Sequence, residues 1–268
     1  MPSPVETQLP RIGAAVIVVF VELHGWTLAE RPELTDRVWD FDAWPEFMKK
    51  DPIGNMYYAV ADSAFPEHVL VFLDDAGAVV ARAFTAPFAH GGTAGELFDD
   101  GWDGVLHRAM RTHVAGDTPD TVSAIEISIK PDVQGSGLSS VVLSAMRDNA
   151  AKLGFTELLA PVRPNGKRDA DQPMSEYVAN VRADGLPSDP WLRVHVRAGG
   201  RIVQVAPRSM VIPGTLAEWR SWTGLPFDTD GPVHVPAALT PVMCDVAHDY
   251  AVYVEPNVWV RHVTVRSK

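Results

Sequence analysis

Apolar side chains follow regular periods through the middle of the chain. Residues 121–129 place three isoleucines alternately with polar residues, which predicts a β-strand with one apolar face. Residues 138–153 carry apolar side chains at helical spacing, and Gly154 stands where a helix C-terminal cap belongs. Residues 158–162 form a short apolar run. The order of strand, glycine turn, helix and strand predicts a βαβ-like unit in an α/β (mixed α+β) fold.

Weaker patterns on both sides of this unit predict further elements. Upstream they are a strand over 16–21, a helix over 39–50 that ends at Asp51-Pro52, a hairpin of strands 68–73 and 78–84, and a helix over 102–113. Downstream they are a long polar loop over 163–190 with a short helix near 174–181, a helix over 191–198, a strand over 202–205, and two strands, 251–254 and 258–263, around a turn at 255–257.

Charge and cysteine content narrow the possible partners. The 268 residues include 23 Lys and Arg against 34 Asp and Glu, a formal charge of −11. This balance argues against nucleic acid and anionic membranes as partners. The single cysteine, Cys244, allows no intrachain disulfide and fits a reducing compartment. The apolar run 12–21 is too short to span a bilayer and lacks a good cleavage site, so we expect a cytoplasmic protein.

The turn between the strand 121–129 and the helix after it has the composition of an anion site. It reads Val133-Gln134-Gly135-Ser136-Gly137. Glycines let a phosphate approach the backbone, and the helix N-terminus supplies partial positive charge. A Walker A loop is absent, and the dinucleotide fingerprint fits poorly because its acidic residue would precede the next strand. An ordinary strand-to-helix connection is the remaining alternative.

This stretch resembles the acyl-CoA signature of the GNAT superfamily of N-acyltransferases, with Gln134 at the Arg/Gln position and Gly137 at the central glycine. Ser139 departs from the usual Gly or Ala. Residues 192–203 resemble the last helix and strand of the family, with His195 where a tyrosine is common. The likeness covers roughly residues 60–207.

The resemblance implies a central twisted mixed β-sheet flanked by helices, with acyl-CoA as donor and an amine as acceptor. We expect an N-terminal extension over 1–55, the acyl-CoA-binding core over 56–210 and a C-terminal extension over 211–268. Two alternatives stay open: an acyltransferase that uses longer acyl-CoA or carrier-protein thioesters, and a non-catalytic acyl-CoA-binding domain. A homodimer is possible.

The resemblance also implies the residues that bind the donor. The strand would pair with the pantetheine, the turn would hold the pyrophosphate, and a free N–H beside the thioester would act as an oxyanion donor. The expected binding residues are Ile127, Ser128, Ile129, Gln134, Gly135, Ser136, Gly137, Leu138, Ser139, Ser140 and Asn165.

Three side chains are candidates for proton transfer. Glu126, on the central strand, is the candidate general base, unless it pairs with an arginine or faces solvent. His195 is the candidate general acid, because an imidazole titrates near neutrality, unless it is a hydrogen-bonded core histidine. Tyr177 is the fallback acid, or else a packing residue.

Other features carry less weight. No metal-binding motif is present, so no metal is expected. The basic group Arg163, Lys167 and Arg168 could contact the 3′-phosphate of CoA or an acidic acceptor, or could belong to a solvated loop. Residues 254–259 either close the acceptor pocket or form a tight turn.

Overall fold

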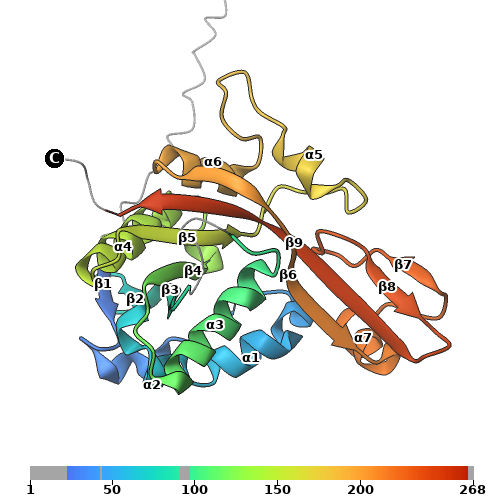
Figure 1. Cartoon of the computed structure of the whole chain (residues 1–268), viewed down its shortest axis with the longest axis horizontal. Helices are drawn as coiled ribbons and strands as arrows, with labels where there is room; N and C mark the ends of the chain where they lie inside the picture. Colours follow the sequence, from blue (N-terminus) through green and yellow to red (C-terminus); the bar gives the residue numbers. More distant parts are fainter. Residues whose placement is uncertain (1–22, 43, 91–96, 265–268) are drawn as a thin grey trace, which may run out of the picture.

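A mixed β-sheet runs through the whole molecule (Figure 1). The structure is a computed structural model and describes residues 23–42, 44–90 and 97–264. Within these residues the sheet has the order β1-β2-β3-β4-β5-β9-β8-β7, and β6 pairs with the other edge of β9. The strands are β1 (His24–Thr27), β2 (Val69–Leu73), β3 (Val79–Phe88), β4 (Thr121–Ile129), β5 (Glu157–Val162), β6 (Arg201–Gly214), β7 (Gly231–Val233), β8 (Val242–Asp245) and β9 (Tyr250–Val263).

Helices cover both faces of the sheet. Helix α3 (Gly101–Ala115) packs on β3 and β6, and α1 (Pro52–Tyr58) packs on α3. On the opposite face α4 (Leu138–Lys152) packs on β3, β4 and β5, and α6 (Pro190–Arg197) packs on α4. Shorter helices are α2 (Ala61–Ala64), α5 (Met174–Val178) and α7 (Leu216–Thr223). No helix of the described part is long and apolar enough to cross a membrane.

The predicted βαβ unit is confirmed by β4, α4 and β5, with β4 and β5 parallel. The two strands meet only at Ser123 and Leu159 and part beyond that point. On its other edge β4 pairs with β3 along its whole length, and a bulge at Ile125 interrupts that ladder. The edge of β4 that faces β5 is therefore open after Ser123, next to the glycine turn.

The hairpin of β2 and β3 and the helices α3 and α6 confirm the corresponding predictions. The helix predicted over 39–50 is wrong. Residues Glu46–Lys50 form only a 3-10 turn, and Asp51 caps a helix that begins at Pro52, where an end was expected. An Asp followed by Pro is also a typical start of a helix, with Asp as the N-cap and Pro as the first residue. Asp51 and Pro52 take these positions in α1. The strand predicted over 16–21 lies outside the described residues.

The C-terminal strand pair is also wrong. Residues Tyr250–Val263 form one strand, β9, without a turn at Glu255-Pro256-Asn257. Its end pairs with β5 and its start with β8, while β6 follows the opposite edge. Pro256 contributes no N–H to a ladder. It lies at a residue of β9 that pairs with neither β5 nor β8, opposite an irregularity in the β6 ladder. The strand predicted over 202–205 is part of the longer β6.

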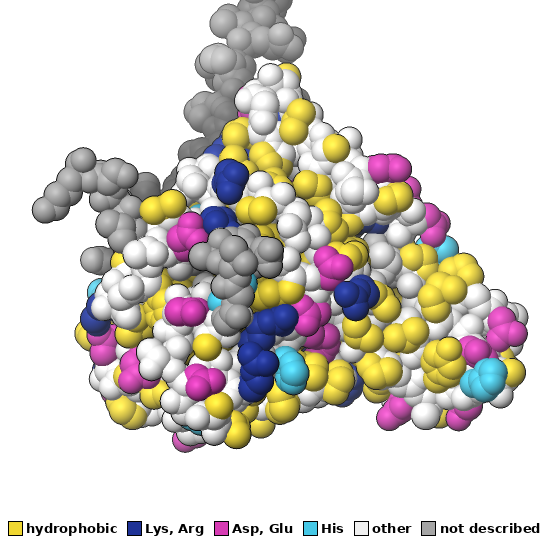
Figure 2. All heavy atoms as spheres, viewed as in Figure 1, with side chains coloured by type: hydrophobic (Ala, Val, Ile, Leu, Met, Phe, Trp, Pro, Cys, Tyr) yellow, Lys and Arg dark blue, Asp and Glu magenta, His cyan; other side chains and the backbone are white. Residues whose placement is uncertain are grey.

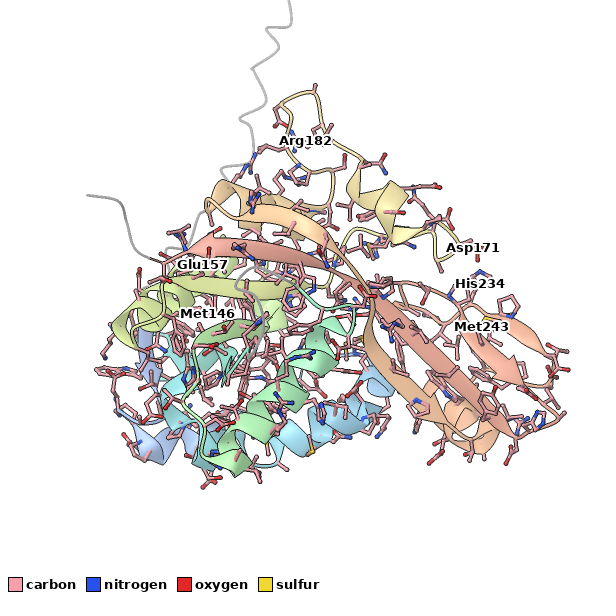
Figure 3. The ribbon with its side chains drawn as sticks, viewed as in Figure 1. Met146, Glu157, Asp171, Arg182, His234 and Met243 are labelled. Atoms are coloured by element: carbon pink, nitrogen blue, oxygen red, sulfur yellow. The ribbon has the colours of Figure 1, made fainter. Side chains whose placement is uncertain are left out.

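The long loop after β5 is ordered by contacts at both ends. Asp171 lies against His234, as Figure 3 shows, with His234 Nε2 3.0 Å from both carboxylate oxygens. Gly166 N–H donates to Asp189, which also caps α6. The loop predicted here is confirmed. It leads from β5 to α6 and contacts the C-terminal region through His234.

Candidate active site

A cavity of about 870 Å³ lies where β4 and β5 part. The glycine turn, the end of β5 and α6 line one part of this cavity. Residues between Trp39 and Tyr58 line another part. Most of the residues predicted to bind the donor reach it: Ile127, Ile129, Gln134, Gly135, Gly137, Leu138, Ser139, Ser140 and Asn165. Ser128 and Ser136 do not line it. The volume is of the size that holds a small molecule or part of a larger one.

The glycine turn is shaped as an anion cradle. Gly135 and Gly137 have φ values of +78° and +87°, which L side chains rarely adopt, and a Cβ at either would meet open space. Gly137 caps the N-terminus of α4. Among the described residues, no hydrogen-bond acceptor faces the N–H groups of residues 135–138. These groups fit the pyrophosphate of an acyl-CoA.

The open edge of β4 lies next to this cradle. The bulge sends Ile125 into the apolar cluster on the α3 side, whereas Ile127 and Ile129 pack on the α4 side. The Ile125 carbonyl accepts a hydrogen bond from Trp102 Nε1 at 3.0 Å. The unpaired edge can accept an extended pantetheine as a strand would be accepted.

Glu126 is buried and pairs with Arg82. Its Oε1 accepts from Arg82 Nε at 2.8 Å and from the Ser128 hydroxyl at 2.6 Å. Its Oε2 accepts from the Tyr58 hydroxyl at 2.7 Å. The arginine pairing considered as the alternative is therefore present, and the carboxylate still lines the cavity.

An aromatic wall, which the sequence analysis missed, forms another side of the cavity. We use this name for Trp39, Phe41, Trp44, Tyr58 and Trp102. Arg82 donates to the carbonyls of Val38 and Phe41, and its guanidinium lies 4.6 Å from the centre of the Trp39 ring. Trp39 and Trp44 could have indicated this wall from the sequence. Their near-helical spacing was instead interpreted as the apolar face of a helix over 39–50.

His195 lines the cavity from α6, with its Nδ1 2.9 Å from His262 Nε2. Burial and the neighbouring His262 lower the pKa of His195 to about 3, and burial lowers that of His262 to about 4. Both shifts favour the neutral form of His195, whereas its candidacy as general acid assumed titration near neutrality. The contact with His262 fits the alternative of a core histidine, but Nε2 is buried without a partner among the described residues and the side chain lines the cavity, so the acid role stays a prediction.

Tyr177 does not line the cavity. Its hydroxyl donates to Asp189 at 2.8 Å, and burial together with this carboxylate raises its pKa. Two members of the basic group considered for the 3′-phosphate of CoA, Arg163 and Lys167, also bind groups within the protein. Arg163 pairs with the buried Glu255 at 2.9 Å, and Lys167 donates to the Leu239 carbonyl at 2.7 Å. These two cations are committed to the protein itself.

Residues 254–259 bring β9 to the cavity, which Asn257 lines. Asn257 Nδ2 donates to Glu255 at 2.9 Å, and its Oδ1 accepts from Ser209 at 2.6 Å. Ser209 in turn accepts the N–H of Trp102 at 2.8 Å. The interpretation of residues 254–259 as a tight turn is wrong, because they belong to strand β9. They contribute Asn257 to the wall of the cavity.

Comparisons with known proteins agree with this geometry. The chain is 30% identical over 269 residues to an arginine N-acetyltransferase of Aspergillus versicolor, covering 88% of this chain and 92% of that protein. The loading GNATL domain of CurA from Lyngbya majuscula superposes with a TM-score of 0.57 at 16% identity, over 92% of this chain and 98% of that one. The GNAT-like decarboxylase GphF, in complex with isobutyryl-CoA, gives 0.53 at 17% identity, over 91% and 100%. No family model matches the sequence.

The chain therefore belongs to the GNAT superfamily, and the resemblance found in the sequence is confirmed. It is an N-acetyltransferase of that superfamily, and acetyl-CoA or another acyl-CoA is its donor substrate. The described residues contain no cluster of three or more potential metal ligands.

Gly137→Ala should weaken acyl-CoA binding. An alanine at this φ costs about 1–2 kcal/mol, and the turn must move to relieve it, so we expect the Kd for acetyl-CoA to rise about tenfold by calorimetry. Gly77→Ala is the matched control, because Gly77 has a φ of +76° and equally open surroundings in the β2–β3 turn. Equal affinity in the two variants would contradict the cradle.

His195→Asn should flatten the dependence of stability on pH. The folded protein keeps His195 neutral, so the unfolded chain takes up the proton first as pH falls below about 6.5. Wild-type stability is therefore full above that pH and declines below it, by about 1.4 kcal/mol per pH unit for this one group. Urea unfolding at pH 7.5, 6 and 5 should show a shallower decline in the variant.

The exposed His107→Asn should retain the wild-type decline. A His195→Asn protein that loses stability as steeply as the wild type would contradict the neutral, buried state of His195.

Proposed function

We propose that the protein acetylates a nitrogen of arginine or of a small molecule that carries an arginine-like cationic group. The observation that carries this proposal is the 30% identity, over nearly the whole chain, to a protein named as an arginine N-acetyltransferase. The donor binds along the open edge of β4, with its pyrophosphate in the glycine turn. The acceptor enters the part of the cavity bounded by the aromatic wall.

The chemistry of that wall supports a cationic acceptor. A guanidinium is planar and weakly hydrated, and it stacks on the faces of tryptophan and tyrosine. The wall already holds one guanidinium in this way, since Arg82 lies over Trp39 and Phe41. Three carboxylates line the cavity: Asp42, Asp51 and Glu126. Lys49 pairs with Asp42 and Arg82 with Glu126, which leaves Asp51 as the carboxylate without a cationic partner among the described residues.

The proposed reaction needs two protons to leave the acceptor cation. A carboxylate takes the first, the neutral nitrogen attacks the thioester carbonyl, and the carbon–sulfur bond breaks. The second proton goes to the departing thiolate, so no imidazolium is required. We assign the first proton to Glu126, because it stands on β4, where the donor lies.

The acceptor is tested by measuring thiol release from acetyl-CoA with L-arginine, with L-citrulline and with no acceptor. Citrulline has nearly the shape of arginine but no charge on its side chain, so losing a charge-assisted hydrogen bond to the guanidinium should lower kcat/KM about 10- to 100-fold. Mass spectrometry of the product identifies the acetylated nitrogen. Equal rates with the two compounds would contradict recognition of the cationic side chain.

The same assay separates the alternatives for the donor. A preference for octanoyl-CoA over acetyl-CoA would favour a longer-chain acyltransferase. Tight CoA binding without thiol release on any amine would favour a non-catalytic domain.

Glu126→Gln should lower kcat at least about 100-fold, the lower end of what general base catalysis contributes, and leave the KM for acetyl-CoA unchanged. Glutamine keeps an oxygen for Arg82 but cannot accept the proton. Tyr58→Phe is the comparison, since it removes the 2.7 Å hydrogen bond to Glu126 and keeps the ring in the wall. Undiminished kcat in a folded Glu126→Gln protein would remove Glu126 as the base.

A further inference from the structure

Asp51 stands apart from the other charged groups that line the cavity. Arg82 pairs with Glu126, Lys49 with Asp42, and Arg163 with Glu255. For Asp51 the described residues provide no cationic partner. It is nonetheless only 2% exposed, and it lines the cavity beside Trp102.

Only one oxygen of the Asp51 carboxylate accepts a hydrogen bond from an N–H group of the described residues. Asp51 Oδ1 caps α1 and accepts the N–H of Gly54 at 2.7 Å. Oδ2 is buried, and no donor among the described residues reaches it. Within the described residues this oxygen can be satisfied only by a proton shared with a second buried carboxyl. Two buried carboxyls beside a cavity are costly, and a cation that replaces the shared proton would find both oxygens free to accept.

Asp103 of α3 faces Asp51 directly. Its Oδ2 accepts the N–H of Val211 at 2.9 Å, and its Oδ1 is likewise buried without a donor in the described part. Burial raises the pKa of both carboxyls, and for Asp103 the adjacent Asp51 raises it further. The other charges that act on the pair are also acidic: Asp100 on α3 and Glu255 on β9. Without a ligand, the pair therefore retains a proton between its two oxygens.

We propose that the Asp51–Asp103 pair is the recognition site for a cationic group of the acceptor, an ammonium or a guanidinium, and that Asp51 contacts it. This inference rests on the proposed function, since it assumes a cationic acceptor. The cation donates to Asp51 Oδ2, and the proton held by the pair leaves to solvent. Asp51 is thus a specificity residue at the acceptor end of the cavity, separate from Glu126 on β4.

Calorimetry with L-arginine as the probe, on the protein saturated with CoA to prevent turnover, tests this site. The titration is done at pH 7.5 in phosphate and in Tris, whose heats of ionisation differ, so that released protons are counted. We expect the wild type to bind arginine and to release protons. Asp51→Asn should raise the Kd at least about tenfold, as the loss of a charge-assisted hydrogen bond requires, while asparagine preserves the cap of α1.

Two further variants sharpen the result. Asp103→Asn leaves Asp51 charged, so arginine should still bind, but without proton release. Asp148→Asn is the control, because it removes the same charge from an exposed position on α4 that does not line the cavity. It should bind arginine like the wild type.

Wild-type affinity in a folded Asp51→Asn protein would overturn the inference, and so would a wild type that does not bind arginine. The acetylation assay then decides the proposed function separately. If the wild type acetylates arginine but Asp51→Asn binds it equally well, the proposed function holds and the recognition site is wrong.

Discussion

The buried ion pair between Arg82 and Glu126 connects the parts of the molecule that must meet at the cavity. Its two side chains stand on adjacent strands and are almost fully buried. Taking two charges out of water is repaid only when further hydrogen bonds satisfy both groups. Arg82 obtains them from the carbonyls of Val38 and Phe41, and Glu126 obtains one from Tyr58. The pair thereby fixes a segment with little regular structure against the central strand and forms the aromatic wall.

A second polar network does the same from the C-terminal side. Glu255 and Asn257 on β9 are buried, and through Ser209 they reach the N–H of Trp102 at the start of α3. The indole of Trp102 then donates to the carbonyl of Ile125, at the bulge of β4. The parting of β4 and β5 leaves a gap in the sheet, and these contacts hold its two sides apart at a defined spacing. Segments from both ends of the described chain are thus needed to complete one cavity.

The sequence was sufficient for features that depend on neighbouring residues. The alternation of β4, the glycine turn and the spacing of α4 predicted the βαβ unit, because local geometry decides it. The donor residues came from the resemblance, and most of them line the cavity. It was insufficient where distant residues decide. Glu126 and Ser128 were expected on a polar face, yet both are buried, since Arg82 and the aromatic wall cover them. The lowered pKa of His195 likewise depends first on burial by distant segments and then on His262, 67 residues away. Strand β9 was divided in two because Pro256 is a turn signal in isolation, whereas its partners β5, β6 and β8 favour a continuous strand.

Net charge is a poor guide to what this cavity binds, and the distribution of the charges explains why. Of the acidic residues, Asp228, Asp230 and Asp245 gather near Cys244 at the β7–β8 end, where Figure 2 also shows acidic side chains, and none of them lines the cavity. The basic residues Arg163 and Lys167 pointed to an anionic ligand, but contacts within the protein occupy both. When the internal pairs of the described residues are set aside, Asp51 remains without a counter-charge on one side of the cavity. The backbone N–H groups of residues 135–138 remain without an acceptor in the described part on another side. Under the proposed function this separation would orient the two substrates, because the N–H groups attract the anionic pyrophosphate and the carboxylate attracts the cationic acceptor.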